Sequence, residues 1–238
     1  GVGVPYAQAG FVYAEVQVAG SGGSEGGPWD YSDKSWALRN YDAIEWLGTQ
    51  PWSTGKVGTF GGSGNGESQL FTSQYRPPHL VTMIPQISSH DGYTLEFPGG
   101  MRSLALVALL CGIPGVATTA TNGVYLPPTN AEQLQEMMKI NEEKVTELRG
   151  NPYCPPLDGV WQHPVRDAYW DDRGTSHIEE VAIPVWVWGS WDDLFVNASQ
   201  HDYLTFGSKD KMFSMGYMSH AGASPGFDPV AQEIRWFD

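Results

Sequence analysis

The segment VGTFGGSGNGESQL at residues 57–70 constrains the fold most, because five of its residues are glycine. An apolar, strand-like stretch enters it and a helix-like stretch leaves it, which is not typical of a flexible linker. A phosphate-binding loop would need a lysine after the glycines, whereas this chain has Glu67, which would repel a phosphate. The segment therefore predicts a sharp turn that joins a β-strand directly to an α-helix.

Strand-like and helix-like segments alternate on both sides of this turn. The predicted strands cover residues 11–18, 55–60, 80–87, 183–189 and 211–217, and the predicted helices cover 33–47, 64–75, 194–206 and 228–237. Strands that alternate with helices at this spacing are typical of a parallel sheet with crossover helices. The predicted fold class is therefore α/β, with a mainly parallel sheet flanked by helices.

The alternation stops between about residues 90 and 180. This stretch contains one clear helical pattern, at 131–149, and loops rich in proline and tryptophan. We interpret it as an inserted helical cap. The predicted organisation is a core formed by residues 1–89 and 181–238, interrupted by a cap at 90–180.

The charge balance bears on the partners of the chain. Asp and Glu number 27 against 13 Lys and Arg, for a net charge of −14. Such a surface repels nucleic acid and anionic membranes, so we predict neither as a partner. The longest apolar run has 14 residues, too few to span a bilayer. We expect a soluble chain, cytoplasmic or secreted, and leave a homo-oligomer open.

No pattern in the sequence predicts a cofactor or a metal. The six histidines, at positions 79, 90, 163, 177, 201 and 220, show no HxH or HExxH spacing. Gly20 and Gly22 fit a dinucleotide-binding fingerprint, but Glu25 stands at its third glycine position. Cys111 and Cys154 are too few for a disulfide framework, and we expect two buried thiols.

The turn at 57–70 also has the character of a nucleophile elbow around Ser63. Such an elbow needs small neighbours, and Gly61, Gly62, Gly64 and Gly66 surround this serine. The N–H groups at the start of the following helix would face a developing oxyanion. The usual G-x-S-x-G pattern is broken, because the last glycine position holds an asparagine. A purely structural glycine turn is the alternative.

Two further motifs follow predicted strands. Asp192 and Asp193 come shortly after the strand at 183–189, and His220 lies in a loop after the strand at 211–217. A histidine activates a serine by taking its proton, and a carboxylate holds the imidazole in the required tautomer. The chain order Ser, Asp, His is that of α/β-hydrolases. The alternatives are that the aspartates only cap the following helix and that His220 is a surface residue.

Several stretches, taken in order, resemble the cocaine-esterase and Xaa-Pro dipeptidyl-peptidase group of α/β-hydrolases. These stretches are GGSEG at 22–26, YDAIEWLGTQPWSTGKVGTFGGS at 41–63, PPHL at 77–80, FPGG at 97–100, DAYW at 167–170, IPVWVWGSWDDLF at 183–195 and EIRWFD at 233–238. The resemblance implies an α/β-hydrolase fold with an inserted helical cap. It makes Ser63 the nucleophile, Asp193 rather than Asp192 the acid, His220 the base, and the Gly64 N–H an oxyanion-hole donor.

The resemblance also implies a function. We expect a serine hydrolase that cleaves an acyl ester or amide through an acyl-enzyme intermediate, acting on a small-molecule ester or a short peptide without a cofactor. An Xaa-Pro dipeptidyl-peptidase is the first alternative, and a catalytically inactive binding or scaffold protein is the second. Two departures bear on specificity. The family usually has a tyrosine where Gly64 stands, and its D-x-R-G motif is absent from residues 17–20.

The same resemblance bears on the extent of the chain. The strand predicted at 11–18 corresponds to the fourth strand of the fold, and the family continues into a β-domain after residues 233–238. We therefore expect these 238 residues to be an interior portion of a longer chain. The family's second oxyanion donor is a tyrosine hydroxyl that follows a proline. Tyr6 follows Pro5, but it stands too close to the strand at 11–18 for that role.

Overall fold

A computed structural model of the chain describes residues 2–19, 24, 34–104, 106, 131–132, 135, 138–139, 158–217, 220 and 226–238. The chain divides into two compact units. The first, here called the sheet unit, comprises residues 2–14, 32–95 and 166–238, and the second comprises residues 1, 15–31 and 96–165. The boundaries of the cap predicted at 90–180 remain a prediction. Most of the helix predicted at 131–149, as well as Cys111 and Cys154, lies outside the described residues.

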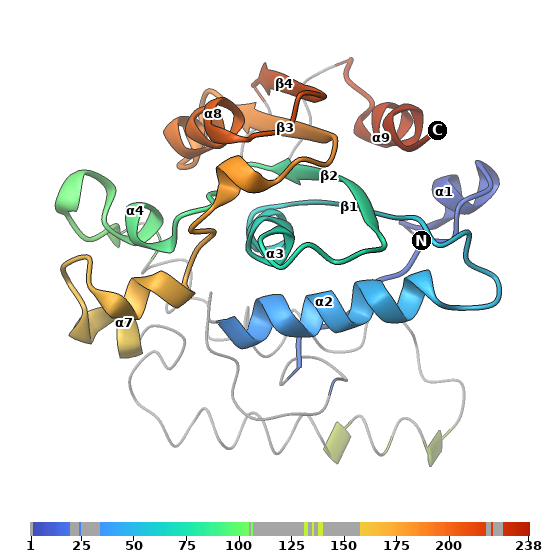
Figure 1. Cartoon of the computed structure of the whole chain (residues 1–238), viewed down its shortest axis with the longest axis horizontal. Helices are drawn as coiled ribbons and strands as arrows, with labels where there is room; N and C mark the ends of the chain where they lie inside the picture. Colours follow the sequence, from blue (N-terminus) through green and yellow to red (C-terminus); the bar gives the residue numbers. More distant parts are fainter. Residues whose placement is uncertain are drawn as a thin grey trace. The chain divides into compact units, whose positions relative to one another are not determined.

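A parallel sheet forms the centre of the sheet unit (Figure 1). Its strands are β1 (Val57–Gly62), β2 (Leu80–Gln86), β3 (Val185–Ser190) and β4 (Lys211–Gly216), in the order β1-β2-β3-β4. All three pairings are parallel, which confirms the predicted α/β class. Every residue of β3 is buried. This burial explains its apolar sequence, because a central parallel strand is covered on both faces.

Four of the described helices lie close to positions that the sequence predicts, and the other described helices were not predicted. The described α-helices are α1 (Val4–Gln8), α2 (Lys34–Gly48), α3 (Gly64–Ser73), α4 (Gly92–Glu96), α7 (Asp158–Gln162), α8 (Val196–Thr205) and α9 (Pro229–Phe237), and the described 3-10 helices are η1 (Pro98–Gly100), η3 (Ala168–Asp172) and η4 (Ile178–Glu180). Helix α3 packs on β1 and β2, α2 packs on α3, and α8 packs on β3 and β4. None of the described helices combines the length and apolar character needed to cross a bilayer.

The C-terminal helix α9 contributes an aromatic layer to the core. Ile84, Trp186 and Trp188 alternate along β2 and β3 and therefore point to one face of the sheet. Trp236 and Phe237 of α9 pack against this cluster. The side chain of Asp228 caps the helix by accepting a hydrogen bond from the N–H of Ala231 at 3.1 Å. Burial of this layer fixes α9 along the sheet.

The prediction of a strand at residues 11–18 is wrong, because these residues form no strand in the structure. β-Branched and aromatic residues suit a strand, but a strand forms only when a neighbour completes its hydrogen-bond ladder. In the described sheet β1 is an edge strand, and residues 11–18 do not pair with it. The aromatic side chains pack instead, with Phe11 against Phe237 and Tyr13 against Tyr6.

Candidate active site

Ser63 occupies a strained turn between the end of β1 and the start of α3. Its φ of 58° and ψ of −129° lie outside the regions that residues other than glycine normally adopt. Backbone hydrogen bonds hold it there. The Ser63 N–H donates to the carbonyl oxygens of Gln86 at 3.0 Å and Ile87 at 3.2 Å. The N–H groups of Gly66 and Glu67 donate to the Ser63 carbonyl oxygen at 2.8 and 2.9 Å. The end of β2 therefore fixes the elbow predicted from the sequence.

Glycine is required at two positions of this turn. Gly61 has a φ of +139°, which other residues rarely adopt, and a Cβ atom there would lie 2.8 Å from the Asn65 Cβ. A Cβ atom at Gly66 would lie 2.6 Å from the Ser88 Oγ and 2.9 Å from the Gln86 carbonyl oxygen. The close approach of α3 to the end of β2 thus depends on the missing side chain at position 66.

Substituting Gly66 by alanine is expected to destabilise the protein, because the backbone of β2 must shift to admit the new methyl group. Overpacking of this kind costs about 1–3 kcal/mol, which a urea unfolding curve measures. Gly64→Ala is the matched control from the same turn, since a Cβ atom there would lie 3.8 Å from the Trp36 ring, an ordinary contact. Equal stability of the two variants would contradict this account of the turn.

The structure brings the three predicted site residues together at the carboxyl end of the sheet. The Nε2 atom of His220 lies 3.0 Å from the Ser63 Oγ, and its Nδ1 lies 2.7 Å from the Asp193 Oδ2. A carboxylate only accepts, so the Nδ1–H of His220 donates to Asp193 and Nε2 is left to accept the serine proton. The carboxyl ends of parallel strands all lie at the same end of the sheet, which explains why residues after β1, β3 and β4 meet here.

The carboxylate of Asp193 is buried and oriented on both sides. Its Oδ1 accepts a hydrogen bond from the N–H of Phe195 at 2.8 Å, and its Oδ2 accepts from His220. The Phe195 ring stacks on the His220 ring, with centroids 5.8 Å apart. The neighbouring Asp192 accepts a hydrogen bond from the Ser190 hydroxyl at 2.6 Å and is exposed. The acid that contacts the imidazole is thus the one that the family resemblance selects.

The hydrogen bond that His220 donates to Asp193 changes the acid–base properties of His220. This bond is the largest influence on the ring, and together with the charge of Asp193 it raises the pKa of His220, while burial of the ring opposes the shift. The carboxylate stabilises the protonated imidazolium. The arrangement therefore suits a base that takes a proton from Ser63 and holds it next to a buried negative charge.

A buried polar network lies next to the Ser63 turn, at the end of β2, and the sequence did not predict it. Glu233 of α9 accepts hydrogen bonds from the Gln86 Nε2 at 2.6 Å and from the Tyr6 hydroxyl. Burial is the main cause that raises the pKa of both Glu233 and Tyr6. The Tyr6 hydroxyl thus donates to a carboxylate. A polar residue on the apolar face of the predicted helix at 228–237 was the only available signal.

One group in the described part of the chain has the composition of a metal-ligand set. It consists of His90, His201 and Asp202 and is analysed below.

Comparisons with known proteins define the family. The family described as "X-Pro dipeptidyl-peptidase (S15 family)" matches residues 2–222. Cocaine esterase of Rhodococcus sp. (strain MB1 Bresler) is 25% identical over 193 residues, which cover 76% of this chain and 34% of the esterase. The family assignment therefore rests on a match that extends over most of the chain.

Solved structures show the same fold. A CocE/NonD family hydrolase from Staphylococcus aureus has a TM-score of 0.62 at 21% identity, with 92% of this chain and 35% of that chain covered. An aminopeptidase from the marine sediment archaeon Thaumarchaeota archaeon has a TM-score of 0.55 at 19% identity, with 85% and 36% covered. The chain thus spans about a third of the length of these relatives. It belongs to the X-Pro dipeptidyl-peptidase (S15) family and has the α/β-hydrolase fold.

Proposed function

We propose that the protein is a serine hydrolase that cleaves acyl esters through an acyl-enzyme intermediate. Ser63 would be the nucleophile, His220 the general base and Asp193 the residue that orients and stabilises the imidazole. The observation that carries this proposal is the continuous hydrogen-bond chain from the Ser63 Oγ through His220 to Asp193, with distances of 3.0 and 2.7 Å. Both distances are within the hydrogen-bond range that a nucleophile needs to its base and a base needs to its orienting acid.

The reaction follows from this geometry. The Ser63 Oγ attacks the ester carbonyl carbon while its proton passes to the His220 Nε2. The oxyanion that forms is stabilised by the N–H of Gly64, which at the first position of α3 has no acceptor within the helix. His220 then gives its proton to the leaving alcohol. A water molecule attacks the acyl-enzyme with His220 again acting as base, and the carboxylic acid leaves as Ser63 regains its proton.

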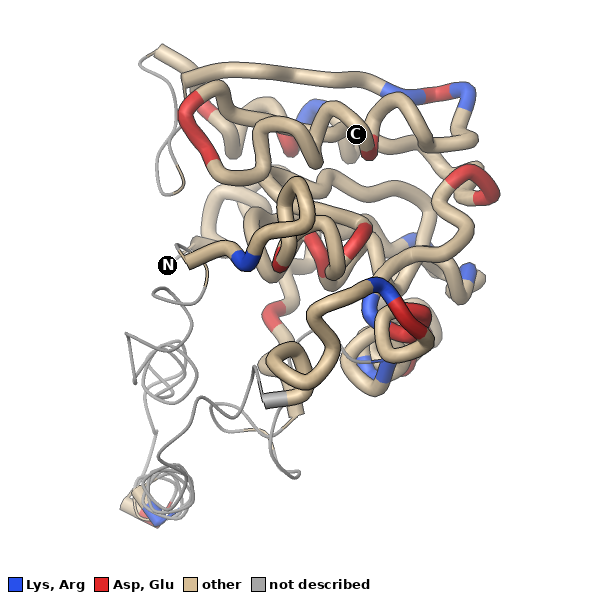
Figure 2. The backbone as a smooth tube through the Cα atoms, turned by 90° about the vertical axis from the view of Figure 1, so that its left-hand side faces the viewer, with Lys and Arg blue, Asp and Glu red and all other residues tan. Residues whose placement is uncertain are grey.

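The ion pairs around the predicted cap support an ester rather than an Xaa-Pro peptide as substrate. An Xaa-Pro peptidase must hold the ammonium group of its substrate with acidic side chains or carbonyl oxygens, and a carboxylate that is already paired with a cation is less available for this contact. Asp91 is paired with Arg166 at 2.6 Å, and Glu96 is paired with Arg102 at 2.6 Å. These carboxylates already have a positive partner. Elsewhere the acidic residues are spread over several elements of the chain (Figure 2).

A substrate panel tests the proposal. We expect p-nitrophenyl esters of short acyl groups to be hydrolysed with a higher kcat/KM than Xaa-Pro-p-nitroanilides, because Asp91 and Glu96, two candidate ammonium ligands among the described residues, are already paired with arginines. The Ser63→Ala variant provides the background rate. A clear preference for the Xaa-Pro substrates would move the assignment to a dipeptidyl-peptidase. Rates equal to the background for both classes would favour a binding or scaffold protein.

A further inference from the structure

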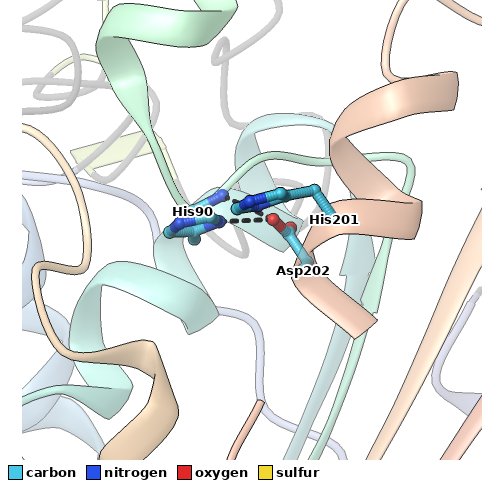
Figure 3. A group of neighbouring side chains, drawn as sticks. All are labelled: His90, His201 and Asp202. Atoms are coloured by element: carbon cyan, nitrogen blue, oxygen red, sulfur yellow. Dashed lines mark hydrogen bonds and ion pairs between the residues drawn. The ribbon is translucent and has the colours of Figure 1, made fainter. Parts of the chain in front are cut away.

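A second cluster of titratable side chains lies between the loop that follows β2 and helix α8 (Figure 3). His90 belongs to the loop, and His201 and Asp202 are adjacent on the helix. We propose that these three residues bind a divalent transition-metal ion of the Zn²⁺ type. The proposal is independent of the proposed hydrolase activity, because it uses none of the residues of that site.

The three side chains converge on a small volume. One ring nitrogen from each histidine and one carboxylate oxygen of Asp202 lie within 4.8 Å of one another. The two imidazole rings are stacked, with centroids 5.3 Å apart and planes inclined by 7°. The Nδ1 of His90 lies 2.5 Å from the Asp202 Oδ1, which also accepts from the His90 backbone N–H at 3.4 Å. Figure 3 shows the His90 ring directed at the Asp202 carboxylate and the His201 ring beside it.

The second oxygen of Asp202 is the independent observation that points to a ligand. The residue is 1% exposed, and its Oδ2 has no hydrogen-bond partner among the described residues. A buried carboxylate oxygen without a partner is unfavourable, because it has lost its hydration without forming a compensating hydrogen bond. A cation bound beside Asp202 would satisfy this oxygen.

The surroundings leave two ligands fixed and one free to adjust. The His90 carbonyl oxygen accepts a hydrogen bond from the Thr175 N–H at 2.7 Å, and Asp202 is buried within α8. His201 is exposed and can rotate toward the other two. Ligands of a tetrahedral zinc ion stand about 2.0–2.1 Å from the metal, so a modest inward rotation of His201 is needed to close the site.

The donor set decides which kind of ion fits. Two imidazole nitrogens and one carboxylate oxygen suit Zn²⁺ and its neighbours in the transition series, whereas Ca²⁺ and Mg²⁺ prefer oxygen ligands alone. Three protein ligands leave the fourth tetrahedral position to water. The nearby Asp91 is not needed as a ligand, since its Oδ2 already contacts Arg166 and Thr94. A bound ion would join α8 to the loop that follows β2.

Zinc binding to untagged, chelator-treated protein tests the proposal directly. Competition with a chromophoric chelator is expected to show one Zn²⁺ per chain, and Co²⁺ in its place is expected to give the visible absorption of a tetrahedral site. His201→Ala removes an exposed ligand without disturbing the core, and it should weaken Zn²⁺ binding by at least the roughly 10–100-fold that loss of an outer-shell partner costs. Asp202→Asn should weaken it similarly.

His177→Ala is the matched control, because His177 is exposed and lies 3.5 Å from the Glu179 carboxylate, the kind of surface pair that could bind zinc adventitiously. This variant should bind Zn²⁺ like the unmodified protein. The proposal is overturned if the unmodified protein binds no Zn²⁺, or if His201→Ala binds it with unchanged affinity. If Asp202→Asn does not fold, the His201→Ala result decides alone.

Discussion

Replacing Ser63 by alanine is expected to lower ester turnover by about 10⁶-fold, the loss that follows removal of the nucleophile from such a triad. The methyl group cannot form the acyl-enzyme, whereas the backbone of the turn is held by hydrogen bonds that do not involve the hydroxyl. Folding should therefore be preserved. The measurements are the initial rate of p-nitrophenyl ester hydrolysis and covalent labelling by a fluorophosphonate probe. The probe should label the unmodified protein at Ser63 and leave the Ser63→Ala variant unlabelled.

Ser68→Ala is the matched control, because Ser68 belongs to the same helix and its hydroxyl donates to the Asn65 carbonyl oxygen at 3.0 Å. This variant should keep its rate and its fluorophosphonate label. A Ser63→Ala protein that retains a tenth of the original activity would show that another residue is the nucleophile.

Asp193→Asn is expected to lower kcat by about 10⁴-fold while the fold is retained. The amide oxygen can still accept from the Phe195 N–H, so the turn before α8 keeps its hydrogen bond. The amide no longer stabilises an imidazolium, and it can hold His220 in the wrong tautomer. Asp192→Asn is the control from the adjacent, exposed position and should lose far less activity. A larger loss in Asp192→Asn than in Asp193→Asn would contradict the assignment.

The pH dependence of ester hydrolysis gives a second test of the contact between Asp193 and His220. His220 must be neutral to accept a proton, so activity should rise with pH as the imidazolium deprotonates. Because Asp193 raises the pKa of His220, the midpoint in the unmodified protein should lie above the ordinary histidine value of about 6.5. In Asp193→Asn this stabilisation of the charged ring is lost, and the midpoint of the residual activity should move to lower pH.

Local patterns in the sequence were sufficient to predict the elements whose structure depends only on residues close by in the chain. The apolar run of β3 and the glycine turn around Ser63 were both predicted where the structure has them. The pattern of apolar residues that indicates a strand, and the backbone freedom that glycine gives a turn, can both be recognised within a few residues. The meeting of Ser63 and His220 could also be predicted, although 157 positions separate them. Parallel strands place their carboxyl ends at one edge, so the chain order of the motifs was enough.

Only the tertiary structure decided the features that depend on a distant partner. Residues 11–18 have the composition of a strand but form none, because ladder hydrogen bonds require a neighbour that local sequence cannot specify. The hydrogen bond between Tyr6 and Glu233 joins positions 227 apart, and that between His90 and Asp202 joins positions 112 apart. No spacing rule connects such residues. Their contact arises from the packing of α9 and α8 against the sheet, which places buried polar groups side by side whatever their separation along the chain.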